Sequence, residues 1–133
     1  MGNEQRVAIN SNIDIVTARQ EGRKLAIKLG FDGTDVTLVA AAISEVARNI
    51  VDHAKEGEVT IEEVHHGNKH GIQVIARDAG PGIPNVAEAM QYGYSTRKGL
   101  GVGLPGAKWL MDEFDIVSKV GKGTTVTMKK WLS

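Results

Sequence analysis

The feature that most constrains this chain is an aspartate that ends an apolar strand and is followed at once by a glycine-rich turn, Asp78-Ala-Gly-Pro-Gly-Ile-Pro84. Apolar and polar residues alternate over 72–77, which predicts a strand ending at Asp78. Gly80 and Gly82 allow backbone conformations closed to other residues and let a flat ring approach the main chain. A carboxylate at this point can accept a hydrogen bond from a donor such as the adenine amino group. The segment therefore predicts one side of a nucleotide pocket.

A second glycine-rich segment, Gly99-Leu-Gly-Val-Gly-Leu-Pro-Gly106, precedes a helix predicted over Leu104–Phe114. Its backbone amides at a helix start predict a surface for phosphate oxygens. Arg97 and Lys98 stand just before it, and a solvated loop and a phosphate contact are equally good interpretations of this pair. The dinucleotide-binding fingerprint is rejected because no buried strand precedes the glycines, and a P-loop is rejected because Gly-Lys-Ser/Thr is missing.

Polar residues lie along one edge of the strongest predicted helix, which starts near Thr34 or Asp35 and carries an apolar stripe to Ile50. Glu45 and Asn49 are one turn apart on that edge. Taken alone, such a pair is typical of a solvated helix face. Followed by the two glycine-rich segments, it favours phosphoryl transfer, in which a carboxylate accepts a hydroxyl proton and an amide oxygen helps to hold Mg²⁺ beside phosphates.

The remaining periodicity predicts an α/β fold with a mixed, mostly antiparallel sheet and helices on one face. A first helix is predicted from Ser11 or Asn12 to Gly30. The region His65–His70 is interpreted as a polar hairpin turn, and its histidines are assigned no role. The expected strands are Gln5–Asn10 at an edge, a strand from Val59, Ile72–Asp78, Ile116–Val120 and Thr124–Trp131, the last two joined by a turn at Gly121–Gly123.

Composition narrows the class of protein. The chain has 133 residues, which suits a single domain over 1–133, and its 16 basic and 16 acidic side chains cancel. This balance argues against a nucleic-acid or anionic-membrane partner. No cysteine, spanning segment or signal-peptide core is present, so a cytoplasmic location is expected.

Four short segments resemble, in order, the motif boxes of the gyrase, Hsp90, histidine kinase and MutL ATPase (GHKL) superfamily. This resemblance implies a Bergerat-type two-layer α/β sandwich. Within the superfamily the chain is similar to the small bacterial serine kinases that regulate sigma factors, and especially to the RsbT-like switch kinases of the stressosome. The four boxes are Ile43–Ile50, Asp78–Gly82, Gly99–Gly103 and Gly123–Thr124, and the more specific likeness lies in Asp14–Arg23, a short lid Tyr92–Thr96, Leu104–Phe114 and Lys130–Leu132.

The resemblance implies roles for individual residues. Glu45 would be the catalytic base, Asn49 would hold Mg²⁺ through the ATP phosphates, and Asp78 would contact adenine. The other residues implied to contact ATP are His53, Gly80, Gly82, Ile83, Thr96, Arg97, Lys98, Gly99, Leu100, Gly101, Val102, Gly103, Leu104 and Thr124.

The implied activity is a serine/threonine protein kinase that uses ATP and Mg²⁺. Its substrates and scaffold would be STAS-domain proteins of the RsbS and RsbR kind, and phosphorylation would release it to a downstream regulator such as a phosphatase. An alternative is an anti-sigma factor that binds a sigma factor and phosphorylates its antagonist. A third is a binding module in which nucleotide only gates docking. The exposed first strand could pair with its copy in a weak homodimer. That its edge is protected by its own neighbours is an equally good interpretation.

Overall fold

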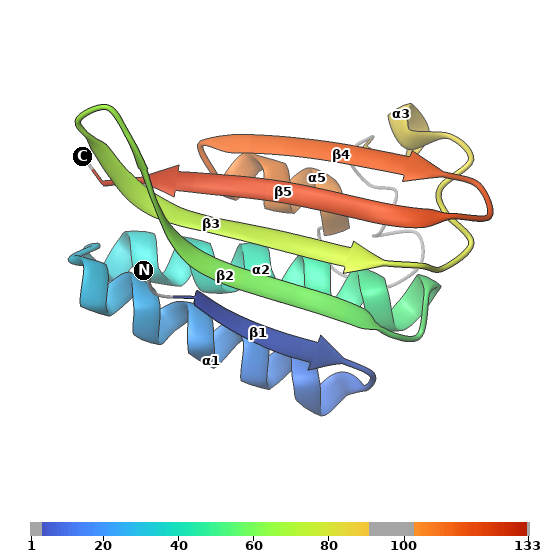
Figure 1. The fold of residues 1–133 in the computed structure, drawn as a ribbon, viewed down its shortest axis with the longest axis horizontal. Helices are drawn as coiled ribbons and strands as arrows, with labels where there is room; N and C mark the ends of the chain where they lie inside the picture. The colour runs from blue at the N-terminus through green and yellow to red at the C-terminus, as the bar shows by residue number, and fades with distance from the viewer. Residues whose placement is uncertain (1–3, 91–102, 133) are drawn as a thin grey trace.

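The computed structural model describes residues 4–90 and 103–132. Its strands form one sheet in the order β1-β2-β3-β5-β4, and every pairing in it is antiparallel (Figure 1). The expected α/β sandwich is confirmed, and β1 lies at the sheet edge as predicted. The strands are β1 (Glu4–Ile9), β2 (Gly57–His66), β3 (Lys69–Asp78), β4 (Glu113–Lys119) and β5 (Gly123–Trp131).

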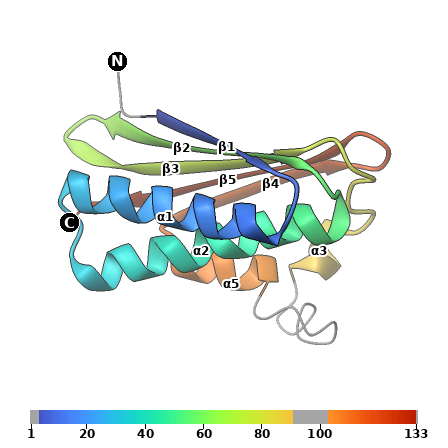
Figure 2. The same ribbon diagram turned by 90° about the horizontal axis from the view of Figure 1, so that it is seen from below.

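The long helices cover one face of this sheet, and α5 lies beside α2 (Figure 2). Between the layers lies an apolar core in which Ile43 and Val46 of α2 meet Ile61 of β2 and Val74 of β3, all at most 1% exposed. The helices are α1 (Asn12–Leu29), α2 (Gly33–His53), the short α3 (Val86–Ala89) and α5 (Gly103–Leu110). Within the described part of the chain, no helix is both long and apolar enough to cross a bilayer.

The ends of α1 follow the predicted capping residues. Ser11 is the N-cap, and its backbone N–H donates to the Asp14 carboxylate over 3.2 Å. Gly30 ends the helix in the left-handed region, at φ 100°. The start of α2 lies slightly before the predicted Thr34, because the Asp32 carboxylate accepts a hydrogen bond from Asp35 N over 2.8 Å and so caps the helix at Gly33.

Two predicted boundaries are wrong. The last helix ends at Leu110 rather than Phe114, because the backbone N–H of Asp112 already donates to Lys129 O of β5 over 2.9 Å and Phe114 pairs with Met128 in the sheet. Phe114 and the alternating residues after it belong to β4. Over so few residues, the apolar pattern at the end of a helix cannot be told from the pattern at the start of a strand.

The turn between β2 and β3 is also shorter than predicted. It consists of Gly67 and Asn68, and the strands continue to His66 on one side and Lys69 on the other. Gly67 has φ 61°, as a two-residue hairpin turn requires. The histidines interpreted as turn residues therefore lie in strands, where sheet register fixes their neighbours.

Candidate functional site

Glu45 ties the middle of α2 to the start of α5. Its Oε1 accepts a hydrogen bond from the backbone N–H of Gly103 over 2.9 Å, and Arg48 Nη1 lies 3.4 Å from Oε2. The side chain is 13% exposed. Burial raises the pKa of the Glu45 carboxyl above 4.5, against smaller lowering effects of the Gly103 hydrogen bond and of Arg48. A largely buried carboxylate of raised pKa is suited to accept a proton.

A groove between α1 and α2 opens beside this carboxylate. It has a volume of about 570 Å³, and its lining includes Glu45, Arg48, Arg19 and Arg23. The sequence reasoning had given Arg48 no role, although its position three residues after Glu45 on a helix was a usable signal. Three arginines and one glutamate line the groove, so its charge is predominantly positive and suits an acidic protein segment.

The turn after β3 packs against the end of α2. Asp78 Oδ1 accepts a hydrogen bond from Gly80 N over 2.9 Å. A Cβ added at Gly80 would lie 2.5 Å from Ala54 Cβ, and Ala54 caps the C-terminus of α2. This close approach requires glycine, and it places the predicted adenine contact next to the helix that carries Glu45.

The first residues of β5 close the same region from the other side. Asp78 is paired with Thr124 in the sheet, and a Cβ added at Gly123 would lie 2.1 Å from Asp78 O. Ser118 Oγ accepts a hydrogen bond from Ile83 N over 2.8 Å and lies 2.7 Å from Thr124 Oγ1. The sequence analysis does not identify Ser118, because a single serine in an alternating strand carries no signal. Only the pairing of β4 with β5 places it beside Thr124.

The other predicted residues fall into distinct environments. Asn49 is half-buried one turn after Glu45, and His53 is exposed as the last residue of α2. Leu104 is 4% exposed and belongs to the hydrophobic core, so only its backbone can contact a ligand. Gly82, at φ 79°, packs closely on Lys119 O. The predicted contacts that lie outside the described residues are Thr96, Arg97, Lys98, Gly99, Leu100, Gly101 and Val102, together with the predicted lid Tyr92–Thr96.

These residues suit an adenine nucleotide. Gly80 N–H occupies one oxygen of the Asp78 carboxylate, and a carboxylate has a second oxygen with which to accept an amino hydrogen. Asn49 lies on the same helix as Glu45, and its amide oxygen is a hard donor of the kind Mg²⁺ accepts alongside phosphates and water.

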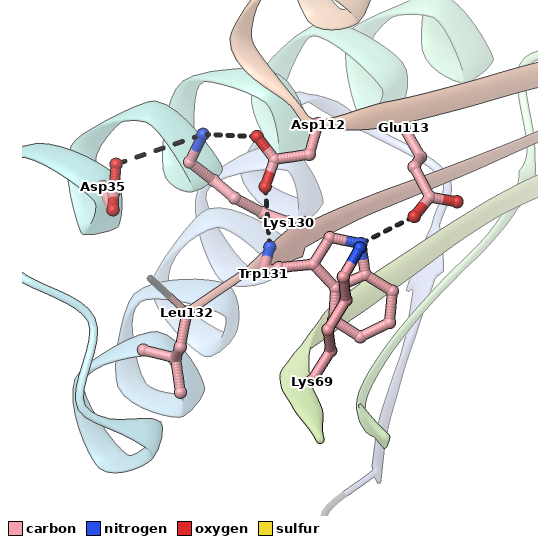
Figure 3. A pocket seen from close by; sticks show the side chains of 7 residues that line it. All are labelled: Asp35, Lys69, Asp112, Glu113, Lys130, Trp131 and Leu132. Carbon is pink, nitrogen blue, oxygen red and sulfur yellow. Dashed lines mark hydrogen bonds and ion pairs between the residues drawn. The ribbon is translucent and has the colours of Figure 1, made fainter. Parts of the chain in front are cut away.

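A second pocket lies elsewhere and contains none of the predicted site residues (Figure 3). Lys130 Nζ donates to Leu110 O over 3.1 Å and lies 3.7 Å from Asp112 and 4.0 Å from Asp35. The indole N–H of Trp131 donates to Glu113 over 2.6 Å. Because these charges are paired with one another, the cluster joins β5 to the N-terminal part of α2 and does not present a ligand site.

The chain matches the family model described as a histidine kinase-like ATPase domain over residues 10–130. It is 48% identical over 132 residues to a protein of Bacillus subtilis (strain 168) named serine/threonine-protein kinase RsbT, with 99% of both chains covered. It is 36% identical over 104 residues to an anti-sigma F factor of Thermoanaerobacter sp. (strain X514), covering 74% of this chain and 71% of that one. An anti-sigma F factor of Clostridium acetobutylicum is 37% identical over 98 residues, covering 69% and 67%.

Proposed function

Because this chain belongs to the histidine kinase-like ATPase family, we propose that it is a serine/threonine protein kinase that uses ATP to phosphorylate a STAS-domain partner in a partner-switching stress response. The full-length similarity to a named serine/threonine-protein kinase supports the activity. The observation that carries the proposal is Glu45, a carboxylate of raised pKa held between the start of α5 and an arginine-lined groove.

The nucleotide in this proposal is bound by the turn after β3 and the start of β5. The Asp78 carboxylate accepts a hydrogen bond from the adenine amino group. Thr124 is paired with Asp78 in the sheet. Gly80 and Gly82 let the turn pack closely on Ala54 and on Lys119. The family resemblance implies that Gly99, Gly101 and Gly103 would contact the phosphates. Asn49 would hold Mg²⁺, and the ion would neutralise phosphate charge.

Glu45 acts as the general base. Gly103 N–H donates to Oε1 over 2.9 Å and Arg48 Nη1 donates to Oε2 over 3.4 Å. Oε2 has the longer contact, and we assign it to accept the proton of the partner's serine or threonine hydroxyl. A pKa above that of an ordinary glutamate makes the carboxylate a better proton acceptor. The position of Glu45 on α2 thus supplies orientation and proton removal, in a reaction for which positioning and neutralisation of charge do most of the catalysis.

The partner reaches Glu45 through the groove between α1 and α2. Arg19 and Arg23 on α1 and Arg48 on α2 favour acidic residues around the acceptor hydroxyl. In the switching cycle implied by the family resemblance, the unphosphorylated partner holds the kinase, and phosphorylation releases it to a downstream regulator such as a phosphatase.

The test uses purified full-length protein, radiolabelled ATP with Mg²⁺, and STAS-domain proteins encoded in the same genome. Wild type should label one of them on serine or threonine. Glu45→Gln should lower the rate at least 100-fold, the range of general-base catalysis, with ATP binding retained. The matched control is Asp115→Asn, which removes the same negative charge from an exposed residue of β4. Equal labelling by wild type and Glu45→Gln would refute the catalytic assignment.

The similarity to anti-sigma F factors supports a second candidate, an anti-sigma factor that also phosphorylates its antagonist. Pull-down distinguishes the two. A stoichiometric complex with a sigma factor, strengthened by ATP, would favour the second candidate, whereas capture of STAS-domain proteins alone favours the switch kinase.

A further inference from the structure

Three potential metal ligands meet at the tip of the β2–β3 hairpin. Glu63 and His65 are two residues apart on β2, so their side chains share a face of the sheet. His70 of β3 is paired directly with His65 and therefore lies on that face too. The hairpin tip is at the end of the sheet opposite α3 (Figure 1). Along β3, His70 and Asp78 are separated by about 26 Å, so this cluster is independent of the nucleotide site.

The ligand atoms of the cluster converge. The carboxylate oxygen and the two imidazole nitrogens all lie within 4.8 Å of one another. His65 Nε2 is 3.2 Å from Glu63 Oε2, and His70 Nε2 contacts the same oxygen. The two imidazole rings are stacked, with centroids 4.5 Å apart and planes 6° from parallel. Both rings therefore turn the same nitrogen toward one point.

The exposure of His65 makes this arrangement informative. Its side chain is 66% exposed, so water could satisfy its nitrogens in many rotamers. Holding it over a second histidine costs side-chain entropy. Lys69, the residue before His70, lies on the other face of the sheet, with its Nζ 5.6 Å from the centre of the Trp131 ring.

We propose that Glu63, His65 and His70 form a binding site for one divalent transition-metal ion of the zinc type. Two imidazoles and one carboxylate are a ligand set that Zn²⁺ takes, with a fourth position left for water. In a tetrahedral zinc site with bonds near 2.0 Å, neighbouring ligand atoms lie about 3.3 Å apart. The 3.2 Å between His65 Nε2 and Glu63 Oε2 matches that spacing. The soft-to-borderline nitrogen ligands disfavour Mg²⁺, so the site is chemically distinct from the one proposed at Asn49.

The ion would link the two strands of the hairpin next to the turn that joins them. Its ligands come from β2 and β3, and the backbone around His70 is already fixed, because Leu132 N donates to His70 O over 2.9 Å. Binding to the folded hairpin alone stabilises the fold by mass action, by about 2.7 kcal/mol at a free metal concentration 100 times the Kd.

The experiment is calorimetric titration of Zn²⁺ into tag-free, chelator-treated protein without nucleotide, with thermal unfolding measured in parallel. We expect one ion per chain and a higher Tm with Zn²⁺. His65→Ala and His70→Ala should each weaken binding at least about tenfold. The matched control is His66→Ala, because His66 is the next residue on β2 but points to the opposite face. It should bind Zn²⁺ as wild type does.

A second readout reports the ligands themselves. Co²⁺ in the same site should give visible absorption bands of a four-coordinate ion, and these should be lost in His65→Ala, whose exposed position leaves folding intact. The absence of binding heat in the wild type would overturn the proposal, and so would equal loss in His66→Ala and His65→Ala. Kinase activity plays no part in either readout, so failure here leaves the proposed function untouched.

Discussion

Glu45 Oε1 accepts a hydrogen bond from the backbone N–H of Gly103 over 2.9 Å, across 58 residues of sequence. This contact joins the helix that carries the proposed base to the first residue of α5. It also orients the carboxylate, because the donor is a main-chain group that cannot rotate away. The burial that accompanies it raises the pKa of Glu45.

Glu45→Gln should stabilise the protein at neutral pH. The raised pKa means that the folded state binds the Glu45 proton more tightly than the unfolded state. The wild type therefore loses stability as pH rises from 4.5 through the folded pKa, and this loss is absent below 4.5. Glutamine keeps an acceptor for Gly103 N–H and has no such pH dependence. Urea unfolding of both proteins between pH 4 and pH 8 measures the difference. If the free energies of unfolding of the two proteins varied with pH in the same way, a raised pKa of Glu45 would be contradicted.

Asp78→Asn should weaken ATP binding at least about tenfold, the effect of losing one half-buried hydrogen-bond acceptor. Asparagine retains an oxygen for Gly80 N–H, so the turn should keep its shape. Its amide nitrogen would face the adenine amino group as a second donor. GTP offers a carbonyl at that position, and its affinity should change less than threefold. Calorimetry with both nucleotides is the measurement, and equal losses would exclude the adenine contact.

Gly123→Ala should destabilise the fold by about 3 kcal/mol, because a Cβ there meets Asp78 O at 2.1 Å and φ is 117°. Gly121→Ala is a matched control, since Gly121 has φ 80° but open space around it. That variant should cost about 1 kcal/mol, the strain of φ alone. Denaturant midpoints compare the two, and similar losses would mean that the close approach to Asp78 does not matter.

Lys130→Met should lower the free energy of unfolding by about 2 kcal/mol, because it removes the hydrogen bond to Leu110 O and leaves Asp35 and Asp112 without their shared cation. The side chain is only 10% exposed, which limits replacement by water. Lys129→Met, one residue earlier on the other face of β5, should cost less than about 1 kcal/mol. Thermal unfolding of both variants tests whether the cluster in Figure 3 stabilises the fold.

Much of the fold follows from local sequence. The apolar stripe of α2 repeats at helical spacing, and the capping residues Ser11 and Gly30 end α1 where predicted, because neighbours within one turn determine both features. The strand that ends at Asp78 and the glycines after it were recognisable for the same reason. The ends of α5 and of the β2–β3 turn were misplaced because pairing with another strand decides them.

The candidate site divides in the same way. The sequence by itself determined which residues are proposed to carry the chemistry, namely Glu45 and Asn49 on one helix edge and Asp78 before its glycines, since residue type and spacing are local properties. Only the tertiary structure decided that Gly103 meets Glu45, that Ser118 joins Ile83 to Thr124, and that two histidines share one carboxylate. Those contacts depend on sheet register and helix packing, which bring together groups that no short-range pattern connects.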